Sequence, residues 1–212
     1  MDKNTNELRD RIIGVAVEAF HQMGIRQVTM DSIAHRLTIS KRTLYQQFED
    51  KEALVLACLS EREKRNEAFL KQIMSETDNV LTILLRVFSH SMDEIGHICP
   101  AFFKELAGYP SVVAAYQSRR DEDIEKGVAF MERGAEQGYF NRKANFRIVI
   151  AFMQQALDHV LENKSLANAS LRDIFINTLM IVLRGCATRE GIIVIDNFLA
   201  EFSDGEKITS SI

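Results

Sequence analysis

The sequence predicts an all-α protein, and composition and periodicity both point to that fold class. Of the 212 residues, 46% are hydrophobic, 26% are charged and only two are proline, a balance that favours long helices. Apolar residues recur at intervals of three and four along most of the chain, which is the period of an amphipathic helix. We expect a small helical domain over residues 1–50, a larger helical domain over 51–205 and a disordered tail over 206–212.

The first fifty residues have the start and stop signals of three short helices. Apolar positions within residues 8–23 share one helical face, and Gly24 can end that helix in a left-handed cap. Thr29 can cap a second helix and Ser40 a third. Residues 49–50 are then expected to stop the third helix and to cap a fourth.

The rest of the chain is expected to form five or six longer helices. Pro100 and Pro110 cannot continue a helix, and Gly138 followed by Asn141 can close one. A break within the last helix is expected near Gly191. The predicted ranges are 51–75, 78–96, 100–107, 110–137, 144–163 and 168–200.

Several classes of protein are disfavoured. No apolar run approaches the ~20 residues of a membrane span, and the polar first ten residues do not have the pattern of a secretory signal, so we expect a cytoplasmic protein. The three cysteines lack C-x-x-C spacing, which argues against a disulfide framework or a zinc site. The five histidines are scattered, and neither G-x-S-x-G nor H-E-x-x-H is present, so we expect no enzyme, metal or cofactor.

Residues 29–48, TMDSIAHRLTISKRTLYQQF, have the pattern of a helix-turn-helix. The second helix of that motif enters the major groove, so small and apolar residues must lie between the helices and polar ones on the outward face. The outward residue types here are Lys, Arg, Thr, Tyr and Gln, which contact phosphates and base edges. Residues 24–47 carry four positive charges and one negative charge, so the net charge of −4 conceals a local cationic patch.

The stretch IIGVAVEAFHQMGIRQVTMDSIAHRLTISKRTLYQQFEDKEAL, residues 12–54, resembles the TetR family signature, in which F-x-x-x-G is followed by T-x-x-x-I-A and S-x-x-T-L-Y-x-x-F-x-x-K-x-x-L. The resemblance implies a repressor that binds palindromic operator DNA as a homodimer and that a small molecule releases. Tyr45 and Lys51 are then expected on phosphates. The residues that it implies face DNA are Thr29, Ser40, Lys41, Arg42, Thr43, Tyr45, Gln46 and Lys51.

Two positions depart from the family pattern. Thr38 stands in the turn where the family usually has glycine, and a β-branched residue disfavours the left-handed conformation that glycine adopts. We therefore expect a strained or differently shaped turn. Gln47 stands where a histidine often precedes the phenylalanine, which removes a titratable group and puts one phosphate contact in doubt.

Two of the late helices are apolar around most of their circumference, which indicates burial on more than one side. A symmetric four-helix interface between two copies would use the second side, and a thick monomeric core is the alternative. The predicted interface residues are Phe152, Leu157, Leu161, Phe175, Leu179, Val182 and Leu183.

Aromatic and methionine residues between positions 84 and 160, with a few polar groups among them, fit either an apolar ligand cavity or an ordinary core. The resemblance favours a cavity for an apolar or amphipathic effector. The candidate lining residues are Phe88, Met92, Phe102, Phe103, Tyr116, Phe130, Phe152, Gln155 and His159. The alternative function is a dimeric small-molecule-binding or protein-interaction module without a DNA role.

Overall fold

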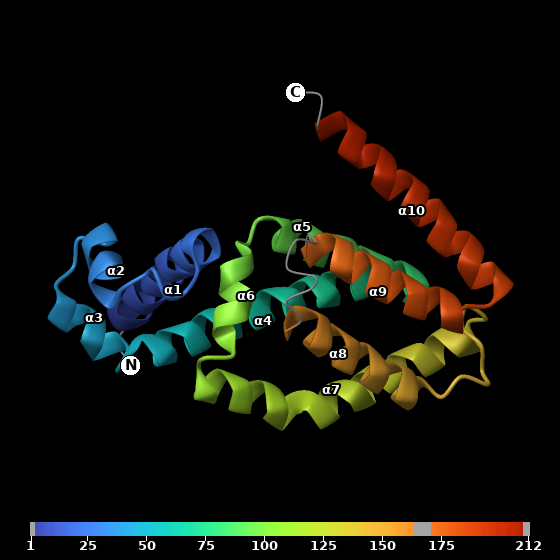
Figure 1. Ribbon diagram of the computed structural model, residues 1–212, viewed down its shortest axis with the longest axis horizontal. Helices are drawn as coiled ribbons and strands as arrows, with labels where there is room; N and C mark the ends of the chain where they lie inside the picture. Colours follow the sequence, from blue (N-terminus) through green and yellow to red (C-terminus); the bar gives the residue numbers. More distant parts are fainter. Residues whose placement is uncertain (1–2, 163–170, 210–212) are drawn as a thin grey trace. The chain divides into compact units, whose positions relative to one another are not determined.

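The computed structural model is all-α, as predicted (Figure 1). It describes the backbone of residues 3–162 and 171–209, and the side chains of residues 6–155, 173 and 176–200. The helices of this part of the chain are α1 (Lys3–Met23), α2 (Met30–Arg36), α3 (Lys41–Gln47), α4 (Lys51–Glu76), α5 (Val80–Gly96), α6 (Pro100–Leu106), α7 (Pro110–Glu136), α8 (Phe146–Glu162), α9 (Leu171–Cys186) and α10 (Arg189–Thr209).

The chain divides into two compact units. Unit 1 comprises residues 1–68 and 96–119, and unit 2 comprises residues 69–95 and 120–212. The division falls inside α4 and α7, so each of these helices contributes residues to both units.

Unit 1 holds the predicted helix-turn-helix on a continuous apolar core. Its buried side chains include Ile12, Phe20, Ile33, Leu44 and Leu54, which lie on α1, α2, α3 and the first turn of α4. The short helix α6 packs against α1. At that contact the Cys99 N–H donates to the carbonyl oxygen of His21 at 2.7 Å, and the Phe102 ring meets the His21 ring edge-on at 5.0 Å. α6 therefore belongs to the same core as the helix-turn-helix.

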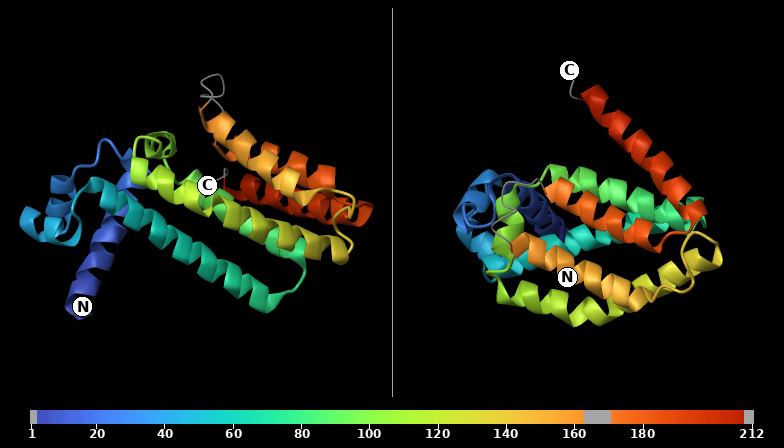
Figure 2. Two further views of the ribbon diagram at one scale, coloured as in Figure 1. Left: turned by 90° about the horizontal axis from the view of Figure 1, so that it is seen from below. Right: turned by 45° about the vertical axis from the view of Figure 1, so that its right-hand side comes forward.

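Unit 2 has its own core, which includes fully buried Leu81, Ile83, Met92 and Phe140. The helices α8 and α9 lie side by side in both views (Figures 1 and 2). Close packing in this unit depends on glycine: a Cβ on Gly134 would lie 2.6 Å from the Phe140 ring.

The expected break near Gly191 lies a few residues earlier, between α9 and α10. The hydroxyl of Thr188 accepts the Gly191 N–H at 3.2 Å, so Thr188 caps α10 and places Gly191 in its first turn. Gly191 is required for space, because a Cβ there would overlap the carbonyl oxygen of Tyr139. α10 then continues to Thr209, past the point where the apolar stripe ends in the sequence.

Candidate nucleic-acid interface

The starts of the helices in the helix-turn-helix are capped as the sequence predicts. The Thr29 hydroxyl accepts the Ser32 N–H at 3.0 Å, and the Ser32 hydroxyl oxygen accepts the Thr29 N–H at 3.1 Å, a reciprocal capping box on α2. The Ser40 hydroxyl accepts the Thr43 N–H at 3.0 Å at the start of α3. Asp50 accepts the Ala53 N–H at 2.8 Å at the start of α4. Thr29 and Ser40 therefore stabilise the two helices of the helix-turn-helix. The predicted DNA residues Lys41, Arg42, Thr43, Tyr45 and Gln46 all lie on α3, which Ser40 caps.

Helix α3 has one buried side and one exposed side. Leu44 is fully buried and Phe48, just beyond the helix, is 2% exposed. The exposed side, which we call the recognition face, consists of Lys41, Arg42, Tyr45 and Gln46. Tyr45 is 42% exposed although it is aromatic. Proteins contact phosphates and base edges of DNA through aromatic, cationic and amide side chains, and the recognition face has all three kinds.

The turn between α2 and α3 is strained at Thr38, as its departure from the family pattern predicts. Its φ of 55° lies in the left-handed region, and among the described residues no other non-glycine residue has a positive φ. Backbone hydrogen bonds hold the turn, because the Thr38 N–H donates to His35 at 3.1 Å and the Ile39 N–H donates to Ala34 at 3.0 Å. The turn keeps the required geometry at a conformational cost.

One cation of the recognition face is already paired. The Lys41 ammonium lies 2.9 Å from the nearer carboxylate oxygen of Asp31, which is on α2. This carboxylate raises the pKa of Lys41, first through the hydrogen bond and then through its charge. By contrast, Arg42 has no hydrogen bond or ion pair in the described structure. The sequence analysis did not identify Asp31 as a partner.

Lys51 lies at a junction within unit 1. It is half-buried, and its ammonium donates to the carbonyl oxygen of Arg26 at 3.5 Å. Burial lowers the pKa of Lys51, and the charge of Glu105 opposes that effect. Glu105 also accepts the Arg26 N–H at 2.8 Å, which ties α6 to the turn after α1. Lys51, the first residue of α4, thus lies close to Arg26 in the turn after α1 and to Glu105 on α6.

Comparisons with known proteins agree with this geometry. Residues 12–58 match the family model described as bacterial regulatory proteins, tetR family. The uncharacterized HTH-type transcriptional regulator YvkB of Bacillus subtilis (strain 168) is 27% identical over 105 residues, which cover 47% of this chain and 56% of that protein. That match therefore spans little more than half of the relative.

Residues 12–58 thus form a helix-turn-helix domain of the TetR family.

Two solved structures show the extent of the shared TetR-type fold. The ketosteroid transcriptional regulator KstR2 of Mycobacterium tuberculosis has a TM-score of 0.56 and 22% identity, covering 87% of this chain and 97% of that one. SmeT, the repressor of the Stenotrophomonas maltophilia multidrug efflux pump SmeDEF, has a TM-score of 0.63 and 16% identity, covering 88% and 94%. The TetR family consists of transcription regulators and is not a family of enzymes. None of the helices in the described part of the chain combines the length and the apolar character that a membrane span needs.

The nine residues predicted to line an effector cavity are divided between the two units. Phe102, Phe103 and Tyr116 belong to unit 1. Phe102 is buried in the core around α1, whereas Tyr116 is 50% exposed. In unit 2 Phe88 and Met92 are buried, Phe130 is half-buried, and Phe152 and Gln155 are exposed. The side chain of His159 lies outside the described residues.

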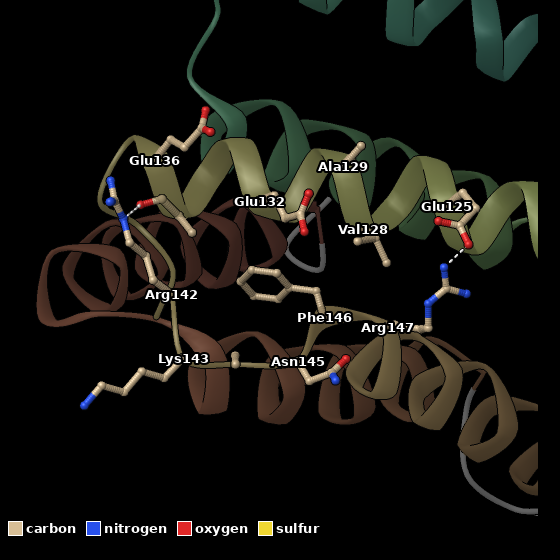
Figure 3. Close-up of a pocket in the computed structure, with 12 residues that line it drawn as sticks. Glu125, Val128, Ala129, Glu132, Glu136, Arg142, Lys143, Asn145, Phe146 and Arg147 are labelled. Atoms are coloured by element: carbon tan, nitrogen blue, oxygen red, sulfur yellow. Dashed lines mark hydrogen bonds and ion pairs between the residues drawn. The ribbon is translucent and has the colours of Figure 1, made fainter.

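A hollow of about 930 Å³ lies in unit 2 between α7 and the start of α8, and it is lined by other residues (Figure 3). Glu125 pairs with Arg147 across it, and Arg142 donates to the carbonyl oxygen of Ala135 at 3.3 Å. The charged side chains of Glu125, Arg142 and Arg147 thus interact with other residues that line the hollow. None of the nine predicted effector residues lines this hollow.

The predicted dimer residues lie in unit 2 and differ in exposure. Phe152 is 63% exposed, and Leu179 and Val182 are half-buried, whereas Leu183 is only 3% exposed and belongs to the core. The side chains of Leu157, Leu161 and Phe175 lie outside the described residues. Ile148 and Ile181, which are not among the predicted interface residues, are 66% and 72% exposed.

Proposed function

We propose that this TetR-family chain is a cytoplasmic repressor that binds palindromic operator DNA as a homodimer and that an apolar or amphipathic effector releases. The recognition face of α3 supports this proposal most directly, because it presents cationic, aromatic and amide groups to solvent on a helix capped for a helix-turn-helix.

The roles proposed for individual residues follow from their chemistry. Arg42 is exposed and suits the two acceptors of guanine, and Gln46 suits adenine. Tyr45 and Lys51 are assigned to phosphates, which fix the register of the protein on DNA but do not read its sequence. Lys41 is proposed to contact a phosphate after exchanging Asp31 for it.

The proposed dimer uses the exposed apolar side chains of α8 and α9. Ile148 and Phe152 are four residues apart on α8 and share one face, and Ile181 lies on the neighbouring α9. Large apolar side chains exposed together mark an interaction surface. A second copy is the proposed occupant because two recognition helices can then engage two half-sites.

The dimer can be tested by replacing Ile181 with glutamate, which would bury an unpaired carboxylate on both subunits. Because Ile181 is exposed within the chain, the monomer should fold, whereas a change at buried Leu183 would damage the core. Sedimentation should show a dimer for the wild type and a monomer for Ile181→Glu. A wild-type monomer at micromolar concentration would refute the interface.

The proposed effector acts by thermodynamic linkage. The effector weakens DNA binding only to the extent that it binds more tightly to the conformation that has the lower affinity for DNA. The coupling free energy between two such sites is typically ~1–3 kcal/mol. α4 is the proposed connection, because its first residues pack in the core of unit 1 and its later residues belong to unit 2. The relatives named for a ketosteroid and for a multidrug pump are consistent with an apolar effector. Calorimetry with such compounds should give different affinities with and without operator DNA; identical affinities would exclude the coupling.

DNA binding is tested by fluorescence anisotropy with fragments of the host genome, titrated with salt. Lys51→Ala should weaken binding to every sequence and reduce the salt slope by about one counterion. Arg42→Ala and Gln46→Ala should change which fragment is preferred, at a cost of ~1–3 kcal/mol for the preferred site. As a control, Lys143→Ala removes an exposed cation of unit 2 and should change neither the salt slope nor the preferred fragment. Binding that none of these variants alters would show that the recognition face is wrongly assigned.

A further inference from the structure

Helix α3 is too short to set its own orientation. It has seven residues, and helices of this length are not stable in isolation. Its first turn is held by the Ser40 cap and by the pair between Lys41 and Asp31. Its other end needs separate support, because the last carbonyl groups of a helix lack partners within it. The last turn of α3 contains no basic residue that could provide that support.

The support comes from α1, through Arg9. One terminal nitrogen of Arg9, Nη1, donates to the carbonyl oxygen of Gln47, the last residue of α3, at 2.7 Å. The guanidinium carbon of Arg9 also lies 4.1 Å from the centre of the Phe48 ring. The hydrogen bond joins residues 38 positions apart in the sequence. A half-buried cation therefore touches both the final carbonyl of α3 and the buried aromatic side chain that follows it.

We propose that Arg9 is a positioning residue that clamps the C-terminal end of α3 and thereby sets how well the recognition face discriminates between DNA sequences. The inference rests on the DNA-binding function proposed above. Tyr45 and Gln46 lie in the last turn of α3, next to the clamped carbonyl. Hydrogen bonds to base edges weaken steeply with misalignment, so a loose end of α3 affects specific binding more than contacts with phosphates.

Arginine suits this position better than lysine does. Its planar guanidinium can stack on an aromatic ring while an N–H in the same plane donates to a carbonyl. A positive charge also interacts favourably with the C-terminal end of a helix. Lysine carries the same charge on a compact ammonium, which is not planar. Lysine should therefore replace the charge of Arg9 without restoring the full clamp.

The test compares Arg9→Met and Arg9→Lys with Arg11→Met in the full-length chain. Arg11 is a matched control, because it is an exposed arginine on the same helix and has no partner among the described residues. Two readouts are measured well below the unfolding temperature. One is the ratio of affinities for the preferred genomic fragment and a scrambled fragment, over a range of salt. The other is the hydrogen-exchange rate of the Phe48 amide in the free protein, which donates to Leu44 at 3.0 Å.

Arg9→Met should lower the affinity ratio about tenfold and speed exchange of the Phe48 amide about tenfold, since a charge-assisted hydrogen bond is lost. The salt slope should stay the same. Arg9→Lys should lie between Arg9→Met and the wild type, and Arg11→Met should leave the ratio and the exchange rate unchanged.

A salt slope that falls by about one, with an unchanged affinity ratio, would show that Arg9 touches a phosphate and would overturn the proposal. Unchanged exchange of the Phe48 amide in Arg9→Met would overturn the clamp whatever the DNA result. A wild type with no preference among fragments would count against the proposed function, while the exchange measurement would still decide the clamp.

Discussion

Replacing Thr38 with glycine should stabilise the protein, although glycine usually destabilises. Thr38 has φ 55°, and its exposed side chain makes no hydrogen bond in the described structure. A residue with a Cβ destabilises the folded protein by ~1–2 kcal/mol in the left-handed region. Glycine destabilises it by roughly 0.5–1 kcal/mol, because glycine has greater freedom in the unfolded chain. Between the midpoints of these two ranges, the difference is a net gain of about 0.7 kcal/mol.

Urea unfolding should show this gain as a higher midpoint with an unchanged slope. In a thermal scan it corresponds to a rise of roughly 1–4 °C for a chain of this length. Thr38→Val is the matched control, because valine keeps the β-branched shape and the strain but lacks the hydroxyl. Its midpoint should not rise. A glycine variant less stable than the wild type, or a valine variant as stable as the glycine variant, would refute the strain at Thr38.

Three further perturbations test other parts of the structure. Asp31→Asn should free Lys41 and raise DNA affinity, most strongly at low salt, as anisotropy would show; unchanged affinity would mean that the pair does not compete with DNA. Gly191→Ala should destabilise by about 1–3 kcal/mol in urea because its Cβ meets a backbone carbonyl, whereas Gly14→Ala, with open space around it, should not. Burial raises the pKa of Cys58 from 9.0 to about 12, so the folded thiol stays protonated while the unfolded one ionises, and this contribution to stability should fall as pH rises from 9 towards 12. Native-state alkylation at pH 8, followed by mass spectrometry, should leave Cys58 unmodified, and rapid labelling would contradict its burial.

The local features of the candidate interface could be predicted from the sequence. The caps at Thr29 and Ser40 and the strain at Thr38 all lie where the residue pattern places them. The residues assigned to the effector and to the dimer were harder to predict, because one apolar stripe describes both a core and an interface. Leu183 and Ile181 are neighbours on the same apolar helix, yet the first is buried and the second is exposed.

The sequence by itself determined the all-α class, the helix-turn-helix and the family. Caps, turns and helical periodicity depend on interactions between residues no more than a few positions apart, so the local sequence is enough to predict them. The tertiary structure alone decided which distant groups meet. It brings Arg9 to Gln47, and it places Gly191 against Tyr139. Such contacts depend on how helices pack, and packing constrains a residue through neighbours that its own helix does not specify.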